Sequence, residues 1–297
     1  MSNKTKAHLA AFTANLIYGA NFSIAKIIMP GMIRPNAFIL LRVVFATFLF
    51  FFMYQFTKTG EKIERRDYFR FFLLGLFGVA INQLLFFQGL SLTSNINAAL
   101  IMTSNPVMVM LFAGILIGER ITLLRITGIF LGILGAGTLI FSNKTTGTGS
   151  FTGDLFIFIN AASYAVFIVM VKPMMKKYNM WLVLTWVFFF GTIIVIPFGF
   201  NDVGMVAWQA FGLIHWGALI FVIFFTTFLA YLLNTLSLKE LSPAVMSYYI
   251  YLQPIFATGI SLAIHHEPLR WVHLISCLMI FTGVYLVTKP TFVKANT

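Results

Sequence analysis

The sequence predicts an all-α polytopic membrane protein with ten transmembrane helices, arranged as two inverted five-helix repeats. Three observations predict this fold: an apolar composition, ten long apolar stretches and an internal similarity between the two halves. Of the 297 residues, 60% are apolar and 9% are charged, whereas about 25% of an ordinary soluble domain is charged. A soluble chain of this composition would aggregate through its exposed apolar surface. The composition therefore excludes a soluble enzyme and a nucleic-acid-binding protein.

The net charge and the cysteine content indicate contact with lipid and exclude some kinds of site. The formal net charge of +12 is interpreted as basic loops that meet anionic lipid head groups. The only cysteine, Cys277, excludes an intramolecular disulfide and a metal site built from several cysteines. His265 and His266 are interpreted as solvated loop residues, because a metal site needs more convergent ligands. We expect no cofactor and no metal, and the absence of a phosphate-binding glycine loop argues against ATP-driven pumping.

Ten apolar stretches have the length of a membrane span, since a helix needs about 20 apolar residues to cross the hydrocarbon core. They are 8–28, 36–56, 68–90, 94–117, 121–142, 153–175, 180–200, 209–236, 242–264 and 270–289. The loops between them are short and leave no room for a soluble domain. Lys4 and Lys6 before the first stretch also fit a signal peptide, but no small-residue cleavage pattern closes it. We therefore expect an uncleaved first span.

The distribution of basic residues predicts the orientation. With the N-terminus in the cytoplasm, 15 Lys and Arg residues fall in cytoplasmic segments and 3 in outer loops, while the remaining two of the 20 lie inside spans. Cytoplasmic loops carry the excess of positive charge in membrane proteins. The sequence thus predicts a multi-pass protein of the plasma membrane with both termini in the cytoplasm.

An internal repeat appears when the chain is shifted by 148 residues. Only 7 of the 52 positions between 84 and 135 are identical to their counterparts. The identical residues nevertheless include the ones expected to break or end helices. Their matches are Pro106 with Pro254, Glu119 with Glu267, and Gly135 with Gly283; at a shift of 146, Tyr18, Lys26 and Met29 match Tyr164, Lys172 and Met175. Five spans per half is an odd number, so the second half is expected to insert upside down. Inverted repeats of this kind are typical of secondary transporters; the alternative is a duplicated structural protein without transport.

The motifs resemble the EamA-type members of the drug/metabolite transporter superfamily. The resemblance covers two units, residues 8–142 and 153–289. In the first unit it rests on the run 18–22 (YGANF) with Lys26, on Pro35 and the Leu-Arg pair 41–42 followed by Ala46, and on Pro106, Glu119, Gly128 and Gly135. The second unit repeats it with Pro254, Glu267 and Gly283, but Ser276 replaces the expected Gly, and residues 164–167 lack the Gly-Asn-Phe core. The resemblance implies a ten-helix bundle with a central cavity, alternating access, and export or exchange of amino acids, nucleotide metabolites or related small solutes. It implies no catalytic residues.

Two cations lie inside predicted spans, where an isolated charge is costly. Lys26 either reaches the nearby membrane surface or faces a cavity. Arg42 either hydrogen-bonds free carbonyls and helix ends or faces a cavity. In the cavity interpretation, both favour anionic or carboxylate-bearing solutes.

Two prolines interrupt predicted spans. Pro106 and Pro254 remove the helical partners of the carbonyls of Met102 and Ile250. Such carbonyls, beside Asn105 and Gln253, suit a binding site in the middle of the membrane, although a locally healed kink explains them as well.

Amides and aromatic side chains complete the candidate site. Amides donate and accept hydrogen bonds, and each one is equally explained as a contact between helices; the aromatic residues are equally explained as bundle core. Gly128-x-x-x-Gly132 permits close helix contact within the fold or in a homodimer. The candidate substrate-binding residues are Asn21, Lys26, Arg42, Asn82, Gln83, Gln88, Asn97, Asn105, Pro106, Asn160, Tyr164, Tyr248, Tyr251, Gln253 and Pro254.

Carboxylates are placed where they cannot act as a conventional proton relay at mid-membrane. All eight fall in predicted loops or at helix ends: Glu61, Glu64, Asp67, Glu119, Asp154, Asp202, Glu240 and Glu267. Glu119 and Glu267 are expected to satisfy backbone donors or to pair with Arg120 and Arg270. The sequence therefore predicts a secondary transporter of small metabolites that works by facilitated flux or exchange and is not an enzyme. The alternatives are a channel-like permease and a structural membrane protein.

Overall fold

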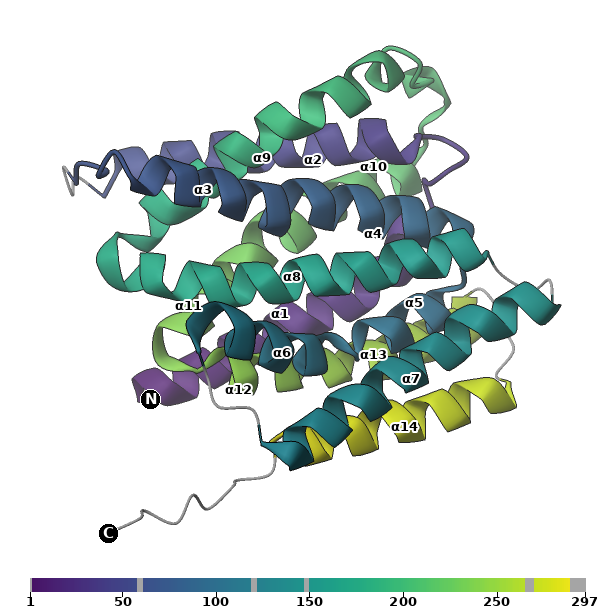
Figure 1. Ribbon diagram of the computed structural model, residues 1–297. Coiled ribbons are helices and arrows are strands. Elements are labelled where there is room, and N and C mark those ends of the chain that lie inside the picture. The colour runs from purple at the N-terminus through teal and green to yellow at the C-terminus, as the bar shows by residue number, and fades with distance from the viewer. Residues whose placement is uncertain (1, 58–60, 119–121, 147–149, 265–269, 289–297) are drawn as a thin grey trace, which may run out of the picture.

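The computed structural model describes residues 2–57, 61–118, 122–146, 150–264 and 270–288 of the chain. In this part every regular element is helical, as Figure 1 shows. The α-helices of the first half are α1 (Asn3–Lys26), α2 (Pro35–Gln55), α3 (Asp67–Gly75), α4 (Ile81–Leu92), α5 (Asn95–Met102), α6 (Asn105–Ile117) and α7 (Leu123–Thr146). Those of the second half are α8 (Phe151–Lys177), α9 (Met180–Val203), α10 (Leu213–Ile220), α11 (Ala230–Glu240), α12 (Pro243–Tyr248), α13 (Leu252–Ile264) and α14 (Trp271–Thr288).

Four short segments join or extend these helices. Two are π-helices, η1 (Leu76–Ala80) between α3 and α4 and η3 (Phe221–Leu229) between α10 and α11. Two are 3₁₀-helices, η2 (Trp208–Ala210) and η4 (Tyr249–Tyr251). Each of the ten predicted apolar stretches thus coincides with one helix or with a chain of consecutive helical segments.

Six helical stretches in the described residues are long and apolar enough to cross a membrane. They are Pro35–Gln55, Asp67–Leu92, Asn95–Ile117, Phe151–Lys177, Met180–Val203 and Leu213–Glu240. Ile126–Thr138 and Trp271–Gly283 are shorter apolar helices. Large apolar side chains such as Phe48, Phe130 and Phe200, each at least 64% exposed, cover the outside of the bundle. Such a surface suits lipid, and the chain is a multi-pass helical membrane protein.

The helix contacts come in matched pairs. In the first half α4 packs against α8, and its counterpart α11 packs against α1. Likewise α6 packs against α8, and its counterpart α13 packs against α1. The remaining large contacts join α2 to α9 and α7 to α14, which are the second and fifth helices of the two halves. The first helix of each half is therefore wrapped by helices of the other half.

The direction of the helices is visible in Figure 1. Helix α1 runs away from the end of the bundle marked N, whereas α8 runs back toward that end. Helix α14 also ends on that side of the bundle. The first helices of the two halves thus run in opposite directions.

Close packing of α7 on α14 requires glycine. A Cβ atom added at Gly283 would lie 2.6 Å from the carbonyl oxygen of Gly128 and 2.7 Å from the nitrogen of Gly132. The backbones of the two helices touch here, so the motif Gly128-x-x-x-Gly132 serves a contact within the chain.

The predicted break at the first proline is present, and hydroxyls beside it bond carbonyls of the preceding turn. Helix α5 ends at Met102, and Pro106 is the second residue of α6, where no helical N–H is needed. The hydroxyl of Thr103 donates to the carbonyl of Leu100 at 2.5 Å, and that of Ser104 donates to Ile101 at 2.7 Å. In the second half, η4 precedes α13, of which Pro254 is the third residue. In the first half the carbonyls of Leu100 and Ile101 thus accept from neighbouring hydroxyls.

Candidate functional site

A cavity lined by polar and apolar side chains lies between the two halves. Its free space is about 470 Å³ including the part open to solvent, and about 50 Å³ of it is wide enough for the centre of a water molecule. Because a buried water needs about 10–15 Å³ by this measure, the cavity admits a few waters. Its lining residues belong to helices α1, α2, α4, α5, α8, α11 and α13 and to η3. They are Tyr18, Asn21, Phe22, Arg42, Asn82, Gln83, Phe86, Phe87, Met102, Asn160, Tyr164, Thr226, Tyr231 and Gln253.

The two π-helices supply backbone acceptors near this cavity. When 148 is added to its residue numbers, η1 falls inside η3. Both halves therefore have a π-helical segment at equivalent positions. π-Helical segments disturb the regular α-helical bonding and are frequent at functional sites. The carbonyl of Gly78 in η1 accepts from the Tyr231 hydroxyl at 2.8 Å, and that of Phe77 accepts from Ser163 at 2.6 Å. Carbonyls of η1 thus hold side chains of the second half.

Arg42 is the charged residue of the lining. It comes from α2, and only 1% of it is exposed. Its Nε donates to the Thr227 hydroxyl at 2.8 Å, and that hydroxyl donates to the carbonyl of Val222 in η3 at 2.9 Å. The guanidinium carbon lies 4.0 Å from the centre of the Phe87 ring. Its Nη1 has no hydrogen-bond partner.

Residues that correspond in the two halves meet at the cavity. Gln83 and Tyr231 differ by 148 positions, and Nε2 of Gln83 donates to the Tyr231 hydroxyl at 2.7 Å. Tyr18 and Tyr164 differ by 146 positions, and both hydroxyls accept from Nδ2 of Asn234, at 3.3 Å and 2.9 Å. The cavity therefore lies where the two halves face each other.

The polar residues before the two prolines also make matched contacts. Nδ2 of Asn105 donates to the carbonyl of Ala161 in α8 at 2.7 Å, and Nε2 of Gln253 donates to Asn15 in α1 at 2.7 Å. Ala161 and Asn15 are themselves 146 positions apart. These contacts join the fourth helix of each half to the first helix of the other.

Seven of the candidate residues line the cavity: Asn21, Arg42, Asn82, Gln83, Asn160, Tyr164 and Gln253. Lys26 instead donates to the carbonyl of Thr93 at 2.7 Å, and Gln88 donates to Asn36 at 2.7 Å. The ring of Tyr251 packs against Phe281, with ring centres 4.7 Å apart.

The remaining candidates are also placed away from the cavity lining. Asn97, Asn105, Pro106 and Pro254 are buried between helices beyond it. The side chain of Tyr248 lies outside the described residues.

Seven lining residues were not among the candidates: Tyr18, Phe22, Phe86, Phe87, Met102, Thr226 and Tyr231. The repeat carried a signal for two of them, since Tyr18 is identical to its counterpart Tyr164, and Tyr231 occupies the position equivalent to Gln83. Phe22 lies in the motif run 18–22. Thr226 lies in η3, and a π-helix has no pattern in the sequence that would have revealed it.

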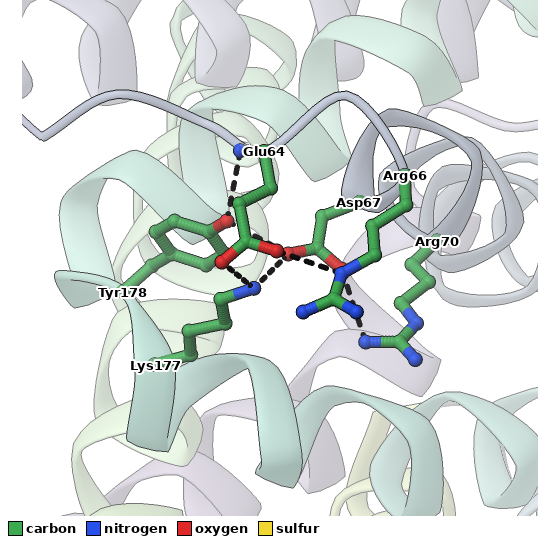
Figure 2. Close-up of polar contacts among 6 residues, drawn as sticks. All are labelled: Glu64, Arg66, Asp67, Arg70, Lys177 and Tyr178. Carbon is green, nitrogen blue, oxygen red and sulfur yellow. Dashed lines mark hydrogen bonds and ion pairs between the residues drawn. The ribbon is translucent and has the colours of Figure 1, made fainter.

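A second polar cluster joins the start of α3 to the end of α8, as Figure 2 shows. Nζ of Lys177 lies 2.6 Å from a carboxylate oxygen of Glu64 and 2.5 Å from one of Asp67, which is fully buried. The Tyr178 hydroxyl donates to Asp67 at 2.7 Å, and Arg70 also pairs with Asp67 at 3.0 Å. The hydrogen bond from Lys177, followed by that from Arg66, holds the pKa of Glu64 below its usual range. This cluster fixes one end of the bundle and lies apart from the cavity.

The described carboxylates lie in loops or near helix ends. Asp67 is the first residue of α3 and Asp154 the fourth of α8, and both are buried. Asp154 accepts from the Thr93 hydroxyl. The expected pairings of Glu119 with Arg120 and of Glu267 with Arg270 stay predictions, because Glu119, Arg120 and Glu267 lie outside the described residues.

A multi-pass helical bundle with polar side chains in a cavity between its halves is the architecture expected of a membrane transporter, and the comparisons show the family. The model of the EamA-like transporter family matches residues 5–141 and 151–289. The chain therefore belongs to this family, within the drug/metabolite transporter superfamily. Family and relatives identify it as a transporter.

The relatives cover almost the whole chain. The chain is 28% identical over 274 residues to the uncharacterized transporter YyaM of Bacillus subtilis, covering 91% of this chain and 89% of that one. It is 26% identical over 292 residues to an uncharacterized transporter of Archaeoglobus fulgidus, covering 96% and 98%. A crystal structure with 17% identity covers 96% of this chain and 98% of its own, with a TM-score of 0.66. This last similarity shows a shared fold.

Proposed function

We propose that the protein is a secondary transporter that exports or exchanges small metabolites, such as amino acids or related solutes, by alternating access at the cavity. One observation carries this proposal: the lining is drawn from both halves, and corresponding residues such as Gln83 and Tyr231 meet there. A site between two structural repeats is the arrangement in which rocking of one repeat against the other exposes a solute to each side in turn.

The proposed architecture has two units, 8–142 and 153–289, of five spans each and inserted in opposite directions. The matched helix contacts, the two π-helices at equivalent positions and the opposite directions of α1 and α8 support it. We place both termini in the cytoplasm and the protein in the plasma membrane, as the excess of basic residues in the inner segments favours. Tags on both ends test this: accessibility from opposite faces would contradict it.

Coupling to protons through a cavity carboxylate is not part of the proposal. Arg42 is the charged residue among the described residues of the lining, and the other lining residues are amides, aromatics, Met102 and Thr226. Intramembrane carboxylates are the usual proton relays of transporters. We therefore expect facilitated flux or exchange that continues when the pH is equal on both sides.

Counterflow in proteoliposomes tests the proposal. Vesicles loaded with an unlabelled solute should take up the labelled solute transiently and saturably, and Gln83→Ala should reduce the rate relative to the distant variant Lys239→Ala. Unsaturable flux with single-channel currents would favour a channel-like permease. The absence of flux for every solute in a broad metabolite panel would favour a structural membrane protein.

A further inference from the structure

Arg42 presents a buried positive charge without a counter-charge. Among the described residues, the ion pairs involve Arg34, Arg66, Arg70 and Lys177, and none includes Arg42. The Thr227 hydroxyl and the rings of Phe87 and Phe38 contact the guanidinium. Nη1 is left without an acceptor although the residue is 99% buried. An uncompensated buried charge is strongly unfavourable, so the site is incomplete without an anion.

A carboxylate is the anion that fits a group of this shape. A guanidinium presents a planar set of N–H donors that matches the two oxygens of a carboxylate. Because Nε is already used by Thr227, the carboxylate is expected at the Nη1 end of the group. The rings of Phe22, Phe86 and Phe87 provide an apolar wall beside it.

The lining also contains acceptors without donors. Oδ1 of Asn21 and Oδ1 of Asn160 have no hydrogen-bond partner, and both residues are buried. Nδ2 of Asn160 donates to the carbonyl of Asn82 at 2.6 Å, which identifies Oδ1 as the free atom of this amide. A solute with a hydroxyl or N–H group would satisfy such an acceptor.

Resting on the transport function proposed above, we infer that the cavity binds a small organic anion with one carboxylate and one hydrogen-bond donor, and that Arg42 is its counter-charge. The solute carries a net charge of −1 and neutralises the lining. A zwitterion presents the same carboxylate, but its ammonium group meets no carboxylate in the lining. A 2-hydroxy acid is therefore expected to bind better than the amino acid of the same skeleton, and both better than the neutral amide.

Two matched series test this order. The first is lactate, alanine and lactamide, and the second is 3-phenyllactate, phenylalanine and 3-phenyllactamide, so that charge changes at nearly constant shape. Binding is measured by thermal stabilisation of the purified protein, and transport by counterflow in proteoliposomes. In at least one series, the hydroxy acid should have an apparent affinity at least about tenfold higher than its amide, as expected when a buried charge gains its partner.

Two variants identify Arg42 as the cause. Arg42→Gln keeps a donor for Thr227 but removes the charge, and it should abolish the preference for the hydroxy acid. Asn21→Asp keeps the number of non-hydrogen atoms in the side chain and places a carboxylate in the same lining. It should reduce hydroxy-acid affinity at least about tenfold, because the cavity then contains its own anion. Arg34→Gln, at an exposed arginine, serves as the control and should behave as wild type.

The outcomes separate the two proposals. If lactamide, phenyllactamide or an amino acid shows saturable counterflow and neither hydroxy acid is preferred, the inferred substrate class is wrong and the transport function stands. A hydroxy-acid preference that survives in both Arg42→Gln and Asn21→Asp also overturns the role of Arg42. If no member of either series shows saturable counterflow, the inference fails together with transport of this class of solute.

Discussion

Lys26 and Lys172 make the same contact in the two halves of the chain. Nζ of Lys26 donates to the carbonyl of Thr93, the residue that follows α4, and Nζ of Lys172 donates to the carbonyl of Leu241, which follows α11. The two lysines are 146 positions apart and the two acceptors 148. Because α1 and α8 run in opposite directions in Figure 1, the two bonds lie toward opposite ends of the bundle.

The first prediction concerns these lysine bonds. Lys26→Met and Lys172→Met should each lower the free energy of unfolding by about 1–3 kcal/mol, since a charge-assisted hydrogen bond is lost. Each should also loosen its own end of the bundle. This is measured by maleimide labelling of Leu90→Cys and Leu238→Cys, two buried positions 148 residues apart, in a Cys277→Ser background.

The labelling result has a crossed control. Lys26→Met should speed labelling at position 90 and leave position 238 unchanged, and Lys172→Met should do the reverse. Equal acceleration at both positions in either variant would mean that the bonds stabilise the whole bundle and do not act at separate ends.

A second prediction concerns the contact of Gln83 with Tyr231. Tyr231→Phe removes a hydroxyl that accepts from Gln83 and has acceptors at Gly78 and Asn82. Leaving these buried groups unpaired should cost about 1–3 kcal/mol of stability. Thermal unfolding in detergent measures this, with Tyr68→Phe, at a partly exposed ring, as the control.

The same pair permits a double-mutant cycle. Because Gln83→Leu removes the donor as well, the double variant should be less destabilised than the sum of the two single variants. Strict additivity would show that the two side chains are not coupled.

Glu64 predicts a dependence of stability on pH. Its pKa is lowered in the folded protein, mainly by the hydrogen bond from Lys177 and then by Arg66. A carboxylate with a lowered folded-state pKa stabilises the protein above its ordinary pKa, and this contribution is lost as pH falls through the lowered value. Melting temperature should therefore fall more steeply below about pH 4.5 in the wild type than in Glu64→Gln. Parallel curves for the two proteins would contradict this role, and Glu61→Gln provides a nearby comparison.

A side chain at position 283 is expected to destabilise the protein by a steric clash. Substitution of Gly283 by alanine places a Cβ atom within 3 Å of the α7 backbone, so α7 and α14 must move apart. The expected loss is about 1–3 kcal/mol, as for other overpacked contacts. Gly137→Ala is the matched control, because a Cβ at Gly137 meets nothing within 4 Å. Similar melting temperatures for the two variants would show that the contact yields without cost.

The sequence predicted the helices better than it predicted their internal geometry. Apolar length located the helical stretches, of which six among the described residues are long and apolar enough to cross a membrane. The proline at position 106 correctly indicated a broken helix. The π-helices η1 and η3 were not predicted, because their extra residue per turn depends on tertiary contacts such as Tyr231 with the Gly78 carbonyl. Boundaries differed by a few residues, as at α1, which begins at Asn3 and not at His8.

The placement of polar residues was predictable only in part. The motif run favoured Asn21, the Leu-Arg motif and the charge inside a span favoured Arg42, and the amide chemistry favoured Gln83, and all three line the cavity. Lys26 and Gln88 have equally suitable chemistry but are turned toward Thr93 and Asn36. When both faces of a helix are apolar, a single sequence does not reveal which face is directed toward the cavity. A polar residue in a span therefore indicated a buried partner more reliably than it indicated the cavity.

The lysine bonds have a consequence for mutational scanning. Each lysine is bonded to a main-chain oxygen, so the bond does not depend on the acceptor's side chain, which is threonine in one half and leucine in the other. An alanine scan would report this bond at Lys26 and Lys172 but not at its acceptors, since alanine carries the same oxygen. Alanine at position 93 would report only the loss of the Thr93 hydroxyl bond to Asp154. Only a backbone change, such as an ester in place of the following amide, would weaken the acceptor itself.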